Sequence, residues 1–291
     1  MPFNKHISNP LMICFSSGKG GVGKTSLALN IAISIAQKGK EILIVDGDLG
    51  LANIDVMLGL AVETTIKDIL TKGGDPLTAL VYPEPNLAVL PASSGIPEMV
   101  DLGNEDTRLL AETLHFIATH FEIILIDTAA GIGQSVLWFN TFVHKNIVIM
   151  TPDPTSITDA YALMKVLSHH HGRKNFYILI NQVEGEDDAK KIFLGIQKVT
   201  DKFLGINLSF LGYVPKDKAM TRAIQTQIPI IQSNPKAESA LAIKMIAQKI
   251  IAMPTQNLYN NNTSHIHSNW NWHSDNNTVA ASKNPNNQPS S

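Results

Sequence analysis

A glycine-rich segment with two lysines lies near the start of the chain, and its residue types suit the binding of a nucleotide's phosphates. Glycines let successive backbone N–H groups point into one concave surface, and the N-terminus of a following helix adds a favourable dipole for anions. The spacing Gly-x-x-x-x-Gly-Lys-Thr places Lys24 to neutralise the β- and γ-phosphates, and the Thr25 hydroxyl to ligate Mg²⁺. The predicted phosphate-binding residues are Gly18, Lys19, Gly20, Gly21, Val22, Gly23, Lys24, Thr25 and Ser26.

Two aspartates that follow apolar runs can supply the remaining chemistry. Phosphoryl transfer needs a metal ion, positioned charge and an oriented water rather than covalent catalysis. Asp127 ends the run 123–126 and is predicted to hold Mg²⁺, while Gly131 lets the backbone that follows approach the γ-phosphate. Asp48 is the candidate for orienting or activating the water and for a further contact to the metal, although an aspartate there could instead cap the following segment. Lys24 and Asp48 are therefore predicted catalytic residues.

Short apolar runs alternate with helical patterns along the chain, and this alternation predicts the scaffold that positions these residues. Runs that are apolar on both faces suit the buried strands of a parallel sheet covered by helices. The alternation predicts an α/β, doubly wound, mostly parallel sheet of seven or eight strands with helices on both faces, whose ligand site lies at the carboxyl ends of the strands. The predicted strands are 11–15, 42–45, 87–90, 123–126, 147–150, 176–180 and 208–214, and the predicted helices are 26–37, 105–120, 156–169, 186–204 and 236–253.

The composition bounds the domain organisation and the class of protein. Of 291 residues, 44% are hydrophobic, which suffices for one large α/β domain over residues 1–253. Residues 254–291 contain eleven Asn with several Ser and Pro. This composition predicts a disordered tail, because the segment cannot bury enough apolar surface to fold. The single cysteine, Cys14, offers neither a disulfide nor an iron–sulfur ligand set and indicates a cytoplasmic protein. A net charge of −2 argues against direct binding of nucleic acid.

The phosphate-binding segment also resembles that of a known family. Residues 19–25, Lys-Gly-Gly-Val-Gly-Lys-Thr, resemble the deviant Walker A box of the MinD/ParA family of P-loop NTPases, which is of the SIMIBI type. The resemblance implies a weak Mg²⁺-dependent ATPase in which Lys19 reaches across a homodimer to the partner's ATP and acts in catalysis; a solvated loop lysine is the alternative. It also implies that Asn53, in a segment like the family's switch I, supports the region of Asp48. Residues that resemble the family's adenine-recognition segments, with ordinary loop residues as the alternative, are Asn181, Pro215 and Asp217.

The likeness extends over residues 11–253 and is closest to the MinD-like flagellar-number regulators called FlhG or FleN. It is carried by residues 48–59, 90–95 and 151–162, the last of which reads Thr-Pro-Asp-Pro-Thr-Ser-Ile-Thr-Asp-Ala-Tyr-Ala. The resemblance implies an ATP-dependent dimer that regulates polar flagellar number and placement, restrains a flagellar master transcription regulator and acts with an FlhF-type GTPase. The chain departs from the family at Met1–Pro10, which lacks the Asp-Gln-Ala-x-x-Leu-Arg motif through which many members stimulate FlhF.

Two other functions and one question of membrane contact stay open at this point. A ParA-type partition or cargo-positioning ATPase would bind DNA through a basic surface stripe. A cell-division-site MinD would carry a C-terminal membrane-targeting helix, which is not evident here. Residues 241–253 have an amphipathic pattern that fits either peripheral contact with the inner membrane or cell pole, or the last helix of the globular domain. The width of the apolar face favours the globular domain.

Overall fold

The structure, a computed structural model, describes residues 7–48, 54–59, 64–91 and 104–255. The chain divides into two units, Met1–Gln256 and Asn257–Ser291, and the first contains the whole sheet. Asn53 and the part of the predicted tail beyond residue 255 lie outside the described residues, so what was expected of them stays a prediction.

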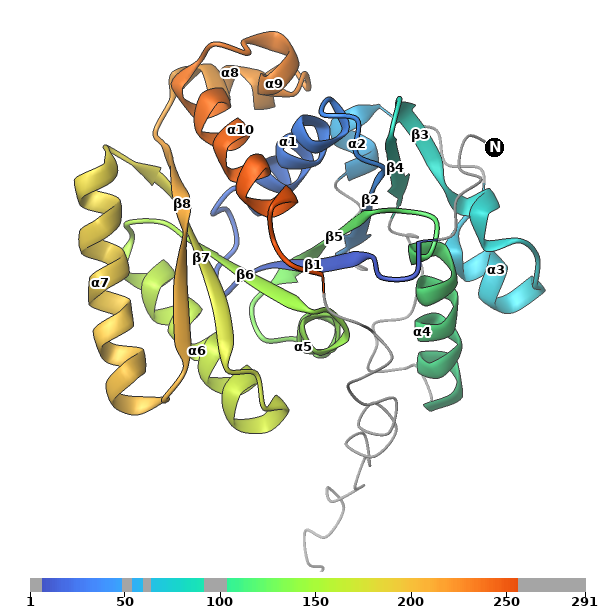
Figure 1. Ribbon diagram of the computed structural model, residues 1–291, viewed down its shortest axis with the longest axis horizontal. Helices are drawn as coiled ribbons and strands as arrows, with labels where there is room; N and C mark the ends of the chain where they lie inside the picture. The colour runs from blue at the N-terminus through green and yellow to red at the C-terminus, as the bar shows by residue number, and fades with distance from the viewer. Residues whose placement is uncertain (1–6, 49–53, 60–63, 92–103, 256–291) are drawn as a thin grey trace, which may run out of the picture. The chain divides into compact units, whose positions relative to one another are not determined.

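Eight strands form one sheet in the order β3-β4-β2-β5-β1-β6-β7-β8 (Figure 1). Every neighbouring pair is parallel except β3 and β4, which are antiparallel and lie at one edge. The seven predicted apolar runs form β1, β2 and β4 to β8, so the doubly wound, mostly parallel fold is confirmed. The strands are β1 (Leu11–Ser17), β2 (Ile42–Gly47), β3 (Val81–Glu84), β4 (Leu87–Leu90), β5 (Ile123–Ala130), β6 (Lys145–Met150), β7 (Asn175–Val183) and β8 (Asn207–Pro215).

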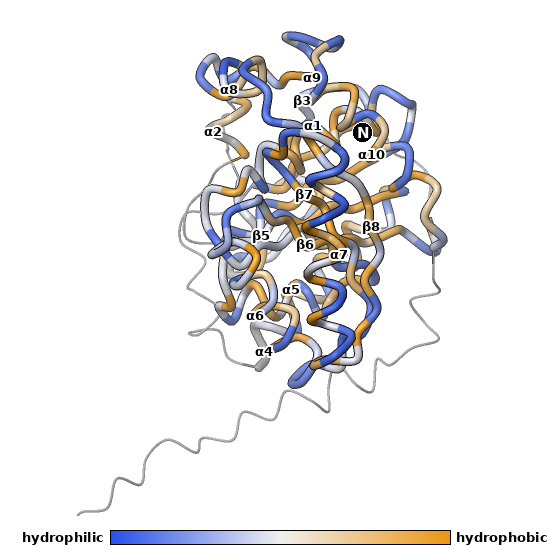
Figure 2. Tube along the Cα trace, turned by 90° about the vertical axis from the view of Figure 1, so that its left-hand side faces the viewer, coloured by the Kyte–Doolittle hydropathy of each residue, from blue (hydrophilic) through white to orange (hydrophobic). Residues whose placement is uncertain are grey.

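Helices cover both faces of this sheet. In β6, Ile147 and Ile149 point into the core beneath α1 and α10, whereas Val148 and Met150 point into the core beneath α5, α6 and α7. Figure 2 shows the hydrophobic residues of the strands lying between the helical layers. The helices are α1 (Lys24–Ala36), α2 (Ile54–Leu58), α3 (Ile66–Lys72), α4 (Asn104–Ala118), α5 (Gln134–Phe142), α6 (Pro154–His171), α7 (Glu186–Phe203), α8 (Lys218–Gln225), α9 (Ile230–Ser233) and α10 (Glu238–Ile251), with a 3₁₀ turn η1 (Pro76–Ala79).

The last helix, α10, is part of the globular domain. Its inner residues Ile243, Ile246 and Ile250 are buried against α1 and β8, as the wide apolar face predicted. Leu241 and Met245, which belong to the same apolar pattern, are instead 49% and 57% exposed. Among the described residues, no helix combines the length and the apolar character needed to cross a membrane.

Candidate nucleotide-binding site

The glycine-rich segment forms the loop between β1 and α1, at the carboxyl end of the parallel strands. β1 ends at Ser17 and α1 begins at Lys24, so residues 18–23 make the loop. Gly21 and Gly23 have φ angles of 77° and 85°, which residues with a side chain adopt only at a cost. Gly23 is the N-cap of α1, and the N–H groups of the first turn lie where a helix N-terminus favours an anion. The loop therefore has a backbone geometry suited to phosphate.

Beneath the loop, Lys24 and Asp127 form a buried ion pair. Lys24 Nζ lies 2.8 Å from Asp127 Oδ1, and the two side chains are 8% and 0% exposed. Burial raises the pKa of Asp127, while the Lys24 ammonium and the Thr25 hydroxyl oppose that rise. Asp127 Oδ2 is buried and has no hydrogen-bond partner among the described residues. A buried carboxylate oxygen without a partner is costly, and the Thr25 hydroxyl interacts with the same carboxylate, so this part of the site suits a hydrated Mg²⁺.

The metal would not have an all-protein cage here. In the part of the chain that the structure describes, no group of three or more His, Cys, Asp or Glu side chains could hold an ion. Mg²⁺ is typically bound through one or two carboxylates together with the phosphates of a substrate and water. The pair of Thr25 and Asp127 fits that mode, in which the nucleotide supplies the remaining ligands.

The end of β5 and the residue after it are hydrogen-bonded to the end of β1, directly before the loop. The Gly131 N–H donates to the Ser17 carbonyl at 2.8 Å, and the Thr128 hydroxyl donates to the Phe15 carbonyl at 3.1 Å. Gly131 has a φ of 95°, so a side chain would be strained there. The residue predicted to approach the γ-phosphate therefore lies beside the phosphate loop.

The carboxyl end of β2 carries two aspartates in different surroundings. Asp48, the predicted water-orienting residue, is partly buried, and its backbone N–H donates to Asp46 Oδ1 at 3.1 Å. Asp46 is only 2% exposed, and its other oxygen accepts the Ile54 N–H at 3.1 Å. Asp46 lies opposite Asp127 in the pairing of β2 with β5, so Asp48 lies at the same edge of the sheet. Asp46 was not predicted as a site residue, although its position directly after the apolar run 42–45 is the signal that could have found it.

Lys19 extends from the loop to the N-terminus of α6. Its Nζ lies 2.6 Å from Asp153 Oδ2 and 2.6 Å from Thr155 Oγ1. Hydrogen bonding from Lys19 holds the pKa of Asp153 well below its usual value, at about 2. The loop and α6 are in direct contact, because a Cβ added to Gly18 would overlap the backbone carbonyl of Asp159. Lys19 is thus anchored while its side chain stays 39% exposed. Asp153 and Thr155 lie in the segment 151–162 that carries the family resemblance, but neither was predicted as a site residue.

Asn181, near the end of β7, is hydrogen-bonded to the phosphate loop. It is 7% exposed, and its Nδ2 donates to the Val22 carbonyl at 2.8 Å. The next residue, Gln182, has a φ of 60° at the point where the register of β7 and β8 shifts. The predicted contact of Asn181 with adenine stays a prediction, and the structure adds a contact with the loop itself.

The turn after β8 links two helices. β8 ends at Pro215, and the Asp217 carboxylate accepts the Ala219 N–H of α8 at 2.8 Å and the Ser239 hydroxyl of α10 at 2.7 Å. Hydrogen bonds from these groups outweigh the effect of burial and lower the pKa of Asp217. The structure therefore gives Asp217 a capping role, and recognition of a base by Pro215 and Asp217 remains untested.

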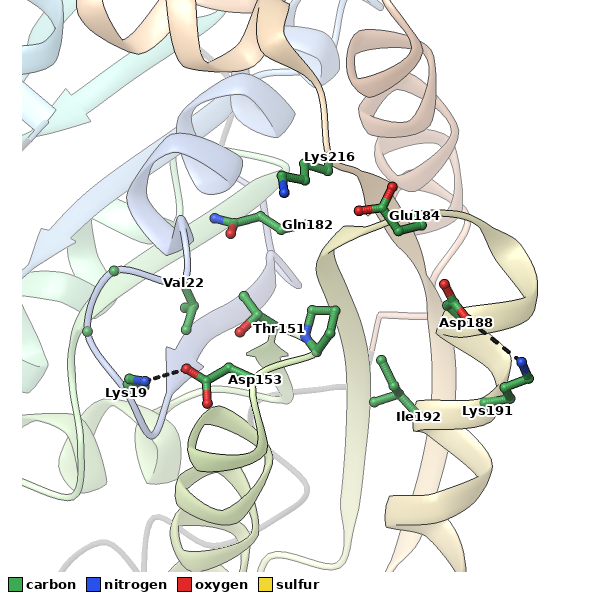
Figure 3. Close-up of a pocket in the computed structure, with 13 residues that line it drawn as sticks. Lys19, Val22, Thr151, Asp153, Gln182, Glu184, Asp188, Lys191, Ile192 and Lys216 are labelled. Carbon is green, nitrogen blue, oxygen red and sulfur yellow. Dashed lines mark hydrogen bonds and ion pairs between the residues drawn. The ribbon is translucent and has the colours of Figure 1, made fainter.

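A cavity of about 680 Å³ opens beside the loop (Figure 3). Its walls come from the loop, from the ends of β6 and β7, and from the first turns of α7, and its volume is in the range of small-molecule sites. In Figure 3, Lys19 and Asp153 line one side, and Gln182 and Lys216 lie above Val22. The α7 side chains at the far wall were missed because charges at a helix start resemble an ordinary solvated surface. They are Asp188, Lys191 and Ile192.

Comparison with known proteins gives a consistent family assignment. The model of the CobQ/CobB/MinD/ParA nucleotide-binding domain matches residues 13–230. The chain is 35% identical over 243 residues to the antiactivator FleN of Pseudomonas aeruginosa, which covers 84% of this chain and 87% of FleN. It is 27% identical to the flagellum site-determining protein YlxH of Helicobacter pylori, over 84% of this chain and 83% of YlxH.

Solved structures show the same fold. The septum site-determining protein MinD of Pyrococcus horikoshii, complexed with Mg-ADP, superposes with a TM-score of 0.69 at 23% identity, over 83% of this chain and 96% of that one. The MinC:MinD complex of Aquifex aeolicus gives a TM-score of 0.67 at 25% identity, over 84% and 98% of the two chains. The family-model match over residues 13–230 includes the loop, the strand-end aspartates and the residues that line the cavity.

Proposed function

This chain belongs to the CobQ/CobB/MinD/ParA nucleotide-binding family, and we propose that it is an ATP-dependent dimerisation switch that regulates the number and placement of polar flagella. In this proposal it is a weak Mg²⁺-dependent ATPase whose ATP-bound dimer and ADP-bound monomer present different surfaces to other proteins. It acts in the cytoplasm and cycles to the cytoplasmic face of the inner membrane or to the cell pole.

Different residues of the site bind ATP and take part in its hydrolysis. The loop N–H groups and the N-terminus of α1 hold the phosphates, and Lys24 exchanges its buried ion pair with Asp127 for contact with them. Thr25 and Asp127 would hold Mg²⁺, which neutralises developing charge on the phosphates when it is bound. Asp48 orients the attacking water from the carboxyl end of β2.

The position of Lys19 is the observation that supports the ATP-dependent dimerisation switch. This lysine is not needed for phosphate binding by a plain loop of this type, yet it is held by Asp153 and Thr155 at the exposed edge of the cavity. An ammonium group has three N–H donors, and two of them serve these contacts. The third is available to a phosphate of a nucleotide bound by a second copy of the chain, which supports a dimer with ATP between the subunits.

The flagellar assignment rests on similarity in sequence to FleN and YlxH, whose names describe an antiactivator and a flagellum site-determining protein. By that analogy the partners are a flagellar master transcription regulator and an FlhF-type GTPase. Counting polar flagella tests this part: deletion of the gene should change the number per cell, and a Lys24→Ala copy should fail to restore it. Restoration by Lys24→Ala would separate any flagellar role from nucleotide binding.

The mass of the protein in solution tests the switch. We expect wild type to be monomeric without nucleotide, and Asp48→Ala, which should bind ATP but hydrolyse it slowly, to be dimeric with ATP and Mg²⁺. Lys19→Ala should bind ATP and remain monomeric. If every variant stays monomeric with ATP bound, the dimer mechanism is wrong.

A further inference from the structure

One buried carboxylate near the end of β2 accepts hydrogen bonds from two backbone N–H groups that follow the strand. Asp46 accepts the Asp48 N–H through Oδ1 and the Ile54 N–H through Oδ2, each at 3.1 Å. The two donors are six residues apart in sequence, on either side of residues 49–53. We propose that Asp46 is a positioning residue for ATP hydrolysis, which fixes Asp48 relative to the γ-phosphate. This inference rests on the proposed ATPase function.

The backbone between Asp46 and Asp48 is also packed closely against neighbouring atoms. A Cβ added to Gly47 would lie 3.0 Å from the Asp127 carbonyl oxygen and 3.0 Å from the Phe139 ring. Real Cβ atoms rarely approach other atoms so closely, so this part of β2 is packed tightly on β5 and α5. The packing at Gly47 and the hydrogen bonds of Asp46 together leave Asp48 little freedom.

The position of this clamp relates Asp48 to the metal site. Asp46 lies opposite Asp127 in the pairing of β2 with β5, and Asp127 is bonded to Lys24 at 2.8 Å. A shift of Asp48 would therefore change its position relative to the groups that hold the phosphates. A displacement of about 1 Å at a reacting centre can cost on the order of 100-fold in rate.

A carboxylate is suited to this task because both of its oxygens accept hydrogen bonds, and buried charge-assisted bonds are strong. Asparagine has the same shape but a single acceptor, and its NH₂ group would face one of the two N–H donors. Asp46→Asn therefore keeps one end of the clamp, whereas Asp46→Ala loses both. The two variants should form a graded series.

Steady-state hydrolysis by the full chain tests the proposal. We expect the kcat to fall about tenfold in Asp46→Asn and about 100-fold in Asp46→Ala, while the KM for ATP and the Mg²⁺ concentration for half-maximal rate change less than about twofold. Adding Asp46→Asn to Asp48→Ala should not lower the kcat further, because the residue to be positioned is already absent. Asp68→Asn is the matched control, and its kcat should equal that of wild type, because Asp68 forms a capping box with Thr65 at the start of α3, which supplies none of the residues named for the site.

Each other outcome overturns the proposal. A raised Mg²⁺ requirement in Asp46→Asn would mean that Asp46 acts on the metal, and an unchanged kcat would mean that it has no part in hydrolysis. A further loss of kcat on the Asp48→Ala background would mean that Asp46 acts independently of Asp48. If Asp46→Ala does not fold, the isosteric Asp46→Asn decides. A wild type without ATPase activity overturns the proposed function as well, whereas an active wild type with unaffected variants overturns only the role of Asp46.

Discussion

The ammonium group of Lys19 lies 2.6 Å from a carboxylate oxygen of Asp153, although the two residues are 134 positions apart in sequence. Lys19 comes from the phosphate loop, and Asp153 is the N-cap of α6. The contact is exposed, with side-chain exposures of 39% and 44%, so it contributes little to folding and its importance lies in where it holds the lysine.

The first prediction concerns that pair. Asn caps a helix as well as Asp does, so Asp153→Asn should keep the cap of α6 and remove the ion pair with Lys19. Without the pair, Lys19 must be ordered when the dimer forms, at a cost of about 1 kcal/mol. We expect the dissociation constant of the ATP-bound dimer to rise about fivefold in an Asp48→Ala background, measured by sedimentation velocity.

Folding should be almost unaffected by this change. The free energy of unfolding of Asp153→Asn should stay within about 1 kcal/mol of wild type. Asp75→Asn, which replaces the N-cap of η1 and does not contact the loop, serves as the control. A tighter dimer in Asp153→Asn would contradict the prediction, since it would mean that Asp153 competes with the dimer for Lys19.

The second prediction concerns Asp127. Its Oδ1 bonds Lys24 at 2.8 Å, and its Oδ2 is buried without a hydrogen-bond partner among the described residues, so this oxygen is available to a cation. In Asp127→Asn, the Mg²⁺ concentration for half-maximal phosphate release should rise at least about tenfold, because a neutral amide is a poor partner for Mg²⁺ and its water. Binding of ATP in the absence of Mg²⁺ should change far less. An unchanged Mg²⁺ dependence would remove Asp127 from the metal site.

Much of the fold was predictable because its strands are buried on both faces and read as continuous apolar runs. The strand β3 was not predicted, because Val-Tyr-Pro-Glu is partly exposed and contains a proline, which is tolerated at the sheet edge where this strand lies. The helix α5 was also missed. Its sequence, Gln134–Phe142, is rich in aromatic and β-branched residues and has no side-chain cap, so its local pattern does not indicate a helix.

The placement of the candidate site residues was predictable where they are adjacent in sequence and not where distant segments meet, and the roles given to them stay predictions. The loop, Asp48 and Asp127 follow from spacing and from their positions after apolar runs. The contact of Lys19 with Asp153 depends on the packing of α6 beside the loop, which spacing does not encode. Asp46 follows its apolar run as Asp127 does, and the hydrogen bonds that Asp46 accepts from the Asp48 and Ile54 N–H groups could not be read from that position.

The third prediction tests the contact between the loop and α6. A methyl group at Gly18 would overlap the Asp159 carbonyl, and backbone atoms cannot move aside as a flexible side chain can. Gly18→Ala should therefore lower the free energy of unfolding by about 2 kcal/mol and weaken ATP binding.

Gly195→Ala is the matched control. Gly195 lies inside α7, and a methyl group added there would have no atom within 4 Å, so this substitution should stabilise the protein by up to about 1 kcal/mol. Urea unfolding measures both. Equal effects of the two substitutions would show that the loop is not packed on α6.

The fourth prediction is a dependence of stability on pH that originates far in sequence from the phosphate loop. His144 lies between α5 and β6, mostly buried, and burial with the nearby positive charges of Arg173 and Lys145 lowers its pKa from 6.5 to about 4. His144 Nδ1 has no hydrogen-bond partner among the described residues.

At pH values between 6.5 and about 4, His144 binds a proton in the unfolded chain but not in the folded chain. The contribution of His144 to the free energy of unfolding is therefore complete above pH 6.5 and is lost as the pH falls towards 4. From pH 7 to pH 5, wild type should lose about 1 kcal/mol more of its free energy of unfolding than His144→Gln, allowing for partial exposure. Urea unfolding of both proteins at the two pH values measures the difference. Parallel losses in the two proteins would mean that His144 is already protonated in the folded state at pH 5, and that the positive charges around it are better solvated than their burial indicates.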